Sequence, residues 1–142
     1  MRYLGLDLGS RTLGVAVSDK TGLIASKVDT IHHNEEYDRL IIDVEKLVTD
    51  LEVEAIVLGF PKNMNNTIGP KGELSLKFKE ALEKRLNIPV YLQDERLSTK
   101  SATDMLIQGD VSRKDRKKVV DSVAATIILQ SFLDGRERNE EK

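Results

Sequence analysis

The chain has 142 residues, of which 39% are hydrophobic and 32% charged, and it contains no cysteine. This length fits one domain with a single core, and the composition does not suggest disorder. The absence of cysteine excludes disulfides and thiolate metal sites. The formal net charge of −2 argues mildly against a nucleic-acid binder. Residues 113–118 nevertheless carry five cations, which predicts either a local basic edge or the solvated start of a helix.

The expected location follows from what the sequence lacks. No apolar run approaches the roughly 20 residues that a membrane-spanning helix needs. A strand pattern begins directly after Met1 and Arg2, so no signal peptide is expected. The absence of cysteine suits a reducing compartment. We therefore predict a cytoplasmic protein without a membrane partner.

The predicted elements follow the order β-β-β-α-β-α-β-α-α. Short turns separate the first three strands, which predicts an antiparallel meander. The fourth strand is apolar without alternation, as is typical of a buried parallel strand. In chain order the predictions are strands 2–8, 12–19 and 23–31, helix 35–51, strand 55–59, helix 72–86, strand 90–94, a helix capped by Ser98 or Thr99 and running to 108, and helix 113–133.

This order predicts an α/β fold. Right-handed crossovers place the fourth strand beside the first and the fifth strand outside it. The result is an RNase-H-like mixed five-stranded sheet of order 3-2-1-4-5, with strand 2 antiparallel and helices on both faces. We expect residues 1–134 to form this single domain and residues 135–142 to form a charged, mobile tail.

Three carboxylates are predicted to meet at one edge of this sheet. Asp7 lies near the end of the first strand, Glu95 closes the fifth, and Asp121 lies on the last helix. Open α/β sheets bind ligands at the carboxyl ends of their strands. Three converging carboxylates repel one another unless a divalent metal joins them, and oxygen ligands favour Mg²⁺ or Mn²⁺. Two such ions about 4 Å apart can activate a water and bind the leaving oxygen of a phosphodiester.

Each carboxylate also has a simpler explanation as a turn residue or as part of a surface ion pair. The argument for a metal site is that one fold brings all three acids to the same edge. His32 and His33 have no partner pattern and are predicted to be surface residues. The simpler explanations are a turn in which Asp7 binds the backbone of Gly9 or Ser10, a surface cluster of Asp94, Glu95 and Arg96, and pairing of Asp121 with Lys117 or Lys118 on its own helix.

Four motifs in register resemble those of the YqgF (RuvX) family. One such motif would be weak, but four in the expected order from residue 5 to residue 125 are specific. They are GLDLGSRTLGVA from Gly5 to Ala16, GFPKNM from Gly59 to Met64 with the following Gly69-Pro70, DERLST from Asp94 to Thr99, and DSVAA from Asp121 to Ala125.

The resemblance implies a bacterial cytoplasmic nuclease of the RNase-H-like fold. Its catalytic and metal-binding acids would be Asp7, Glu95 and Asp121, with Mg²⁺ or Mn²⁺ as cofactor. Two substrates are associated with the family, the 5′ end of precursor 16S rRNA in ribosome biogenesis and the Holliday junction. RuvC-type resolvases carry a glutamate just after the strand equivalent to 55–58, whereas this chain has Gly-Phe-Pro there. The second ligand would therefore have to come from the fifth strand.

Five further motif residues are candidates for substrate binding. Arg11 and Arg96 flank the proposed metal site and could bind non-bridging phosphate oxygens in bidentate fashion. Lys62, Asn63 and Lys71 belong to a long loop that could contact a nucleic-acid backbone, although a plain connector would have the same composition.

Three other kinds of protein share parts of the pattern. The Asp-x-Gly turn between strands also opens actin-like and sugar-kinase-like ATPases, but those close two such domains over ATP and this chain supplies one. A dinucleotide site is weaker, because Gly5-x-Asp7-x-Gly9 lacks the G-x-G-x-x-G spacing. A non-catalytic nucleic-acid-binding module would keep the basic residues and need no carboxylate triad. The oligomeric state, monomer or homodimer, is left open.

Overall fold

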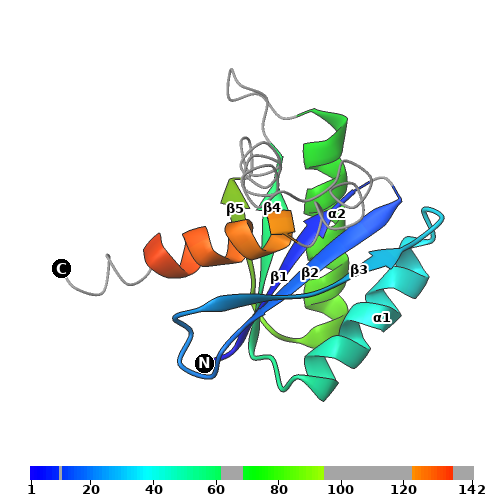
Figure 1. Ribbon diagram of the computed structural model, residues 1–142. Coiled ribbons are helices and arrows are strands. Elements are labelled where there is room, and N and C mark those ends of the chain that lie inside the picture. Colours follow the sequence, from blue (N-terminus) through cyan, green and yellow to red (C-terminus); the bar gives the residue numbers. More distant parts are fainter. Residues whose placement is uncertain (10, 62–68, 95–122, 136–142) are drawn as a thin grey trace, which may run out of the picture.

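The computed structural model describes residues 1–9, 11–61, 69–94 and 123–135. Within them, five strands form one sheet in the order β3-β2-β1-β4-β5, which confirms the predicted topology (Figure 1). A further helical segment, residues 123–135, follows in the chain. The other elements are β1 (Tyr3–Leu8), β2 (Thr12–Ser18), β3 (Ala25–His32), α1 (Tyr37–Asp50), β4 (Ala55–Phe60), α2 (Pro70–Leu86) and β5 (Val90–Asp94).

Strand directions also agree with the prediction. β2 is antiparallel to both β1 and β3, while β4 runs parallel to β1 and β5 runs parallel to β4. β5 has the predicted bounds, but β3 begins two residues later than expected. The reason is that the backbone N–H groups of Leu23 and Ile24 donate to the Asp19 carboxylate, which keeps these two residues in the turn.

Both fully described helices begin at residues other than those predicted. α1 begins at Tyr37 because Glu35 has a φ of 64°, which a right-handed helix cannot contain. α2 begins at Pro70, whose fixed φ and missing N–H suit the first position of a helix. It ends at Leu86, as predicted, where Asn87 adopts the left-handed conformation with a φ of 55°.

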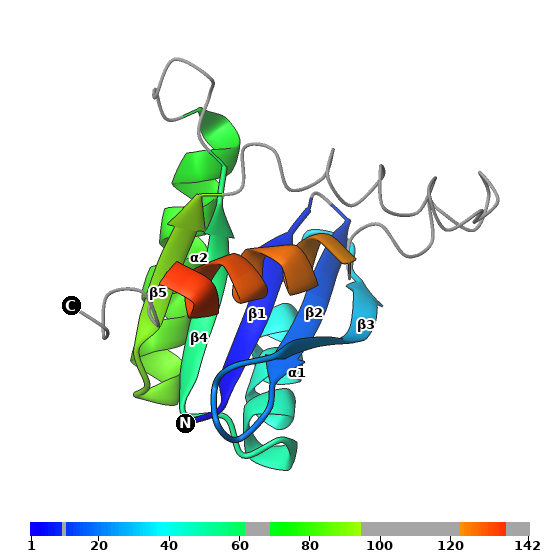
Figure 2. The ribbon, with the colours of Figure 1, turned by 60° about the vertical axis from the view of Figure 1, so that its left-hand side comes forward.

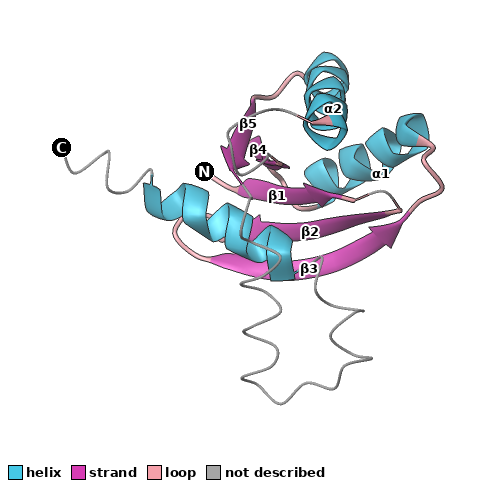
Figure 3. Ribbon diagram, turned by 90° about the horizontal axis from the view of Figure 1, so that it is seen from above, coloured by secondary structure: helices cyan, strands magenta, loops and turns pink. Residues whose placement is uncertain are grey.

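The two helices α1 and α2 cover one face of the sheet. Alternate residues of β1, namely Leu4, Leu6 and Leu8, point to this side and join a core with α1 and α2. Figure 3 shows both helices on the same side of the sheet, with the 123–135 helix on the other. This core contains most of the large buried aliphatic side chains that the structure describes. It is therefore the main source of hydrophobic stability in this part of the chain.

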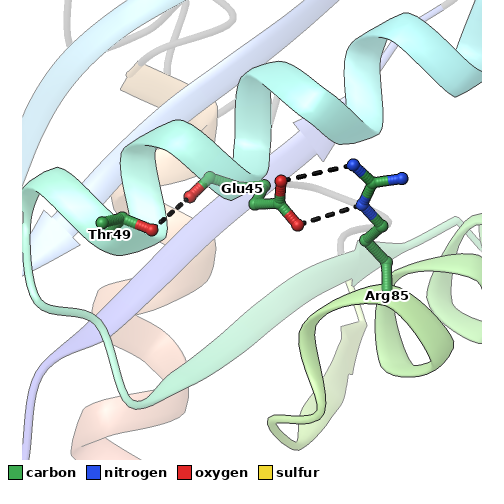
Figure 4. A network of polar contacts seen from close by, with 3 residues as sticks. All are labelled: Glu45, Thr49 and Arg85. Atoms are coloured by element: carbon green, nitrogen blue, oxygen red, sulfur yellow. Dashed lines mark hydrogen bonds and ion pairs between the residues drawn. The ribbon is translucent and has the colours of Figure 1, made fainter.

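An exposed ion pair joins α1 to α2 across the outside of the molecule. Arg85 Nε donates to Glu45 Oε2 at 3.0 Å, and Thr49 Oγ1 donates to the carbonyl oxygen of Glu45 at 3.1 Å (Figure 4). The hydrogen bond between the two side chains lowers the pKa of Glu45 and raises that of Arg85. Because the pair is open to solvent, it contributes little to stability.

The 123–135 helix covers the opposite face. It crosses the strands from β2, over which its 123 end lies, towards β5 (Figure 2). A Cβ atom on Gly5 would lie 2.7 Å from Leu129 Cβ and 3.1 Å from the carbonyl oxygen of Ala125. The helix therefore packs against backbone at the centre of β1, which requires glycine there.

One side chain also joins this helix to the turn before β3. Gln130 accepts the Ala25 N–H at 2.8 Å and donates to the carbonyl oxygen of Leu23 at 2.9 Å. The described part of the predicted last helix is thus confirmed as helical and as packed on the sheet. Its first part, the predicted helix ending at 108 and the tail beyond 135 lie outside the described residues. Among the described helices, none is both long and apolar enough to cross a membrane.

Candidate active site at the carboxyl edge of the sheet

The strand register places the ends of β1, β4 and β5 level with one another. Leu6 of β1 pairs with Leu58 of β4, and Leu58 pairs with Leu92 of β5. Asp7 lies one residue beyond this row, and Asp94 pairs with Phe60 at the end of β4. The three parallel strands therefore finish at one edge, as the predicted topology requires.

Asp7 is half-buried on the face that the 123–135 helix covers. It follows Gly5 by two residues, so the two share a face of β1. Its neighbour on β2 is Gly14, which has no side chain to fill the space beside the carboxylate. The Gly9 N–H donates to the Thr12 carbonyl oxygen at 2.7 Å and is therefore already engaged in closing the turn.

The face of the sheet on which Asp94 lies follows from its neighbours on β5. Tyr91 faces the 123–135 helix, because its ring stacks on Phe132 with 5.3 Å between centroids. Val90 and Leu92 belong to the opposite core, beside α1 and α2. Strand alternation assigns Asp94 to the side of Val90 and Leu92, away from the face of Asp7.

Two helix N-termini lie at the same edge. α1 follows β3 and α2 follows β4, and both of these strands run parallel to β1. The backbone N–H groups at a helix N-terminus carry a partial positive charge that attracts anions. Neither helix has a side-chain cap. Lys71 in the first turn of α2 and Arg11 at the start of β2 are exposed, so both described cations among the predicted substrate contacts flank this edge.

Several predicted site residues lie outside the described part of the chain. Among the described residues, no three histidine, aspartate, glutamate or cysteine side chains gather closely enough to bind a metal ion. Asp7 would therefore need partners from the ranges that the structure does not describe. The predicted residues in those ranges are Glu95, Asp121, Lys62, Asn63 and Arg96.

Sequence reasoning was wrong about His33. The prediction made it a surface residue without a partner, but it is half-buried and its Nε2 lies 3.1 Å from the carbonyl oxygen of Gly9. One signal could have found it: His33 directly follows a strand parallel to β1 and must therefore reach the same edge as Asp7. His32 is exposed, as predicted.

Solved structures similar to this one identify the fold class. A T. thermophilus RuvC in complex with a Holliday junction substrate matches with a TM-score of 0.61 and 17% identity, over 97% of this chain and 96% of that one. A second Thermus thermophilus RuvC structure matches with a TM-score of 0.59 and 17% identity, over 97% of each chain. Together with the sheet order, this likeness shows an RNase-H-like fold.

Sequence comparison then shows the family. The family model described as "RuvX: Holliday junction resolvase" matches residues 1–135. A relative from Bacillus subtilis is 54% identical over 135 residues, which is 94% of this chain and 98% of the relative. A Geobacillus relative is 51% identical over 138 residues, which is 96% of this chain and 100% of the relative. Both relatives are named "Putative pre-16S rRNA nuclease". The chain belongs to the RuvX family, which confirms the resemblance of its four motifs.

Proposed function

We propose that this protein is a metal-dependent nuclease that hydrolyses phosphodiester bonds and acts in 5′-end processing of pre-16S rRNA. The names of the Bacillus subtilis and Geobacillus relatives support the reaction and the substrate. The RNase-H-like fold supports the placement of the chemistry at the carboxyl edge of the sheet. Such an enzyme would meet its RNA substrate in the cytoplasm.

One observation carries the proposal, namely the register that brings Asp7 level with the end of β5. Tyr91 and Gln93 occupy alternate positions on the face of the 123–135 helix, and the same period of two predicts Glu95 on that face. In the sequence, Asp121 stands two residues before Val123, and the 123 end of the described helix lies over β2 (Figure 2). All three acids are thus expected on the face and at the edge where Asp7 lies.

The donor set at this edge fits a hard divalent cation. Its predicted ligands are carboxylate oxygens, which suit Mg²⁺ or Mn²⁺, and Gly14 leaves room beside Asp7. When bound, the metal would supply Lewis-acid polarisation of the phosphate and a water of lowered pKa. In the proposal, Asp7, Glu95 and Asp121 bind the metal, Arg11 and Arg96 bind phosphate oxygens, and Lys62, Asn63 and Lys71 contact the nucleic-acid backbone.

The test compares Asp7→Asn with Asp94→Asn on a precursor 16S rRNA fragment in the presence of Mg²⁺. Both variants replace a carboxylate by an amide of the same shape, but only Asp7 lies on the proposed metal face. We expect Asp7→Asn to lose at least about 100-fold in cleavage rate and to bind Mn²⁺ more weakly by calorimetry. Asp94→Asn should cleave at the parent rate. Cleavage by Asp7→Asn at the parent rate would exclude the proposed mechanism.

A Holliday junction is the alternative substrate, because the matching family model is described as a Holliday junction resolvase. A four-way DNA junction should therefore be assayed beside the rRNA fragment, together with the mass of the protein in solution. Cleavage of the junction by a dimer, with the rRNA fragment left intact, would favour the resolvase, since two symmetric cuts need two sites. Binding that is indifferent to Mg²⁺, without cleavage of either substrate, would favour a non-catalytic module.

A further inference from the structure

The turn that follows Asp7 is tied to the connection between β3 and α1 by a single residue, His33. Its backbone N–H donates to the carbonyl oxygen of Arg11 at 2.9 Å. Its ring nitrogen Nε2 lies 3.1 Å from the carbonyl oxygen of Gly9. His33 thus binds both described residues of the turn between β1 and β2. We call the contact between the ring and Gly9 the His33 bridge.

The neighbouring backbone determines which ring nitrogen carries the proton. The Glu35 N–H points at His33 Nδ1, with 3.0 Å between the nitrogens, so Nδ1 is an acceptor. The proton of the neutral ring is therefore on Nε2, which donates it to the carbonyl oxygen of Gly9. The Tyr37 ring packs beside the imidazole with 5.6 Å between centroids and restricts its orientation. Both ring nitrogens are thus used, each in a defined role.

The backbone that presents this ring is strained. Glu35 has a φ of 64°, a conformation that costs a non-glycine residue on the order of 1 kcal/mol. The strained residue is the one whose N–H binds His33 Nδ1. Glycine would relieve the strain, yet the chain has glutamate here and compensates with the bond to the ring. The connection between β3 and α1 thus holds the His33 ring in one orientation through the N–H of its strained residue.

We propose that His33 is a positioning residue of the active site, acting through the His33 bridge on the turn that follows Asp7 and carries Arg11. Gly9 follows Asp7 by two residues, and Arg11 is a proposed phosphate contact, so the bridge restrains both from outside the β1–β2 pair. Displacements of about 1 Å in a catalytic group can cost on the order of 100-fold in rate. This proposal rests on the proposed nuclease function. The effect of the His33 bridge on the turn can nevertheless be measured without an activity assay.

Two conservative variants separate the two ring contacts. In His33→Gln, the amide nitrogen can reach the position of Nε2 and donate to the Gly9 carbonyl, while the acceptor for Glu35 is lost. In His33→Asn, the amide oxygen takes the position of Nδ1 and accepts the Glu35 N–H, while the bridge is lost. We expect kcat to fall about 10-fold or more in His33→Asn, and to stay within about 3-fold of the parent in His33→Gln. KM should change less than kcat in both, because the backbone N–H of residue 33 still donates to the Arg11 carbonyl oxygen.

The matched control is the exposed neighbour His32, changed to Asn and to Gln. Both control variants should keep the parent kcat. Equal kcat for His33→Asn and the parent would overturn the proposal. Equal losses in His33→Asn and His33→Gln, accompanied by equal falls in Tm, would also overturn it, because a purely structural role does not distinguish the two contacts.

A second measurement uses the metal-free protein and needs no substrate. The Gly9 N–H donates to the Thr12 carbonyl oxygen within the turn, so its exchange with solvent reports whether the turn is ordered. We expect faster Gly9 exchange in His33→Asn than in His33→Gln or the parent, and unchanged exchange overturns the proposal. If Asp7→Asn proves fully active, the nuclease mechanism fails, while the Gly9 exchange still decides whether the bridge orders the turn.

Discussion

The two faces of the sheet are packed with side chains of different size. On the face of α1 and α2, the inward positions of β1 are leucines that are 0–9% exposed. On the other face, β1 contributes Tyr3, Gly5 and Asp7, and the core on this side also contains the small residues Ala16 and Ala55. β1 thus contributes three leucines to one side, but only one large apolar side chain, that of Tyr3, to the other.

Because their side chains differ in this way, the two faces of β1 have different roles, one in stability and the other in function. Large aliphatic side chains contribute burial and can be exchanged for others of similar volume at low cost. Bare backbone allows the 123–135 helix to approach closely, so its position is determined by direct contact with Gly5. Asp7 follows Gly5 by two residues on the same face of β1. It therefore lies close to a point where direct contact fixes the distance between the helix and the sheet. We infer that the first face mainly stabilises the fold and the second mainly positions the site.

The largest effect on stability is expected on the leucine face. Leu6 is fully buried between β1 and the helices α1 and α2. Its replacement by alanine should leave a cavity and lower the free energy of unfolding by about 2–5 kcal/mol. Denaturant unfolding measures this loss. Leu76→Ala, at a position 40% exposed on α2, is the control and should change stability by no more than about 0.5 kcal/mol.

Folded Leu6→Ala protein, assayed well below its Tm, should retain the parent kcat because the altered side chain faces away from Asp7. A specific loss of kcat in the folded variant would mean that the two faces are not functionally separate.

A smaller loss of stability with a larger loss of activity is expected from Gly5→Ala. The added Cβ would lie 2.7 Å from Leu129 Cβ, so either the helix or the strand must shift. We expect a destabilisation of about 1–3 kcal/mol and a fall in kcat beyond what the remaining folded fraction explains. Gly135→Ala is the matched control, since a Cβ there would meet nothing within 4 Å. Parent activity in Gly5→Ala would show that the close approach does not matter to the site.

The smallest effect is expected from Asp19→Asn, in the turn between β2 and β3. Hydrogen bonds from Thr21 and from the Leu23 and Ile24 amides lower the pKa of Asp19 from 3.8 to about 2. Because the folded pKa is depressed, the ionised group stabilises the fold above the unfolded value and loses this contribution as the pH falls towards 2. The Tm of Asp19→Asn should be lower than the parent Tm at pH 7, by a few degrees at most. The difference should shrink between pH 4 and pH 2, and a constant difference would contradict the assignment.

The fold was predictable because its signals are local and repeated. Period-2 and period-3.6 patterns, short turns and the handedness of crossovers sufficed for the sheet order. Errors occurred at the helix starts. Glu35 adopts a positive φ that favours glycine, which residue propensity cannot anticipate. Pro70 was assigned to the preceding loop, although proline suits the first position of a helix.

The candidate site was predictable only in part. Asp7 could be singled out because an ionisable residue inside an apolar strand is costly without a purpose. The register then showed what no motif contained, that Asp94 falls on the face away from Asp7. His33 was missed because its importance lies in a contact with a backbone carbonyl, and a carbonyl oxygen is present at every position of a chain. Pattern analysis of side chains has no access to such contacts.

The contact between Gly5 and Leu129 also has a consequence for protein synthesis. These two residues are separated by most of the chain, and Leu129 must leave the ribosome before it can cover the central strand. All five strands and the helices α1 and α2 precede Leu129 in the chain, so they leave the ribosome before the helix that covers this face. If Asp121 completes the metal site as proposed, a partly translated protein cannot cleave RNA. The order of the sequence would then keep a nuclease inactive beside the ribosome that is making it.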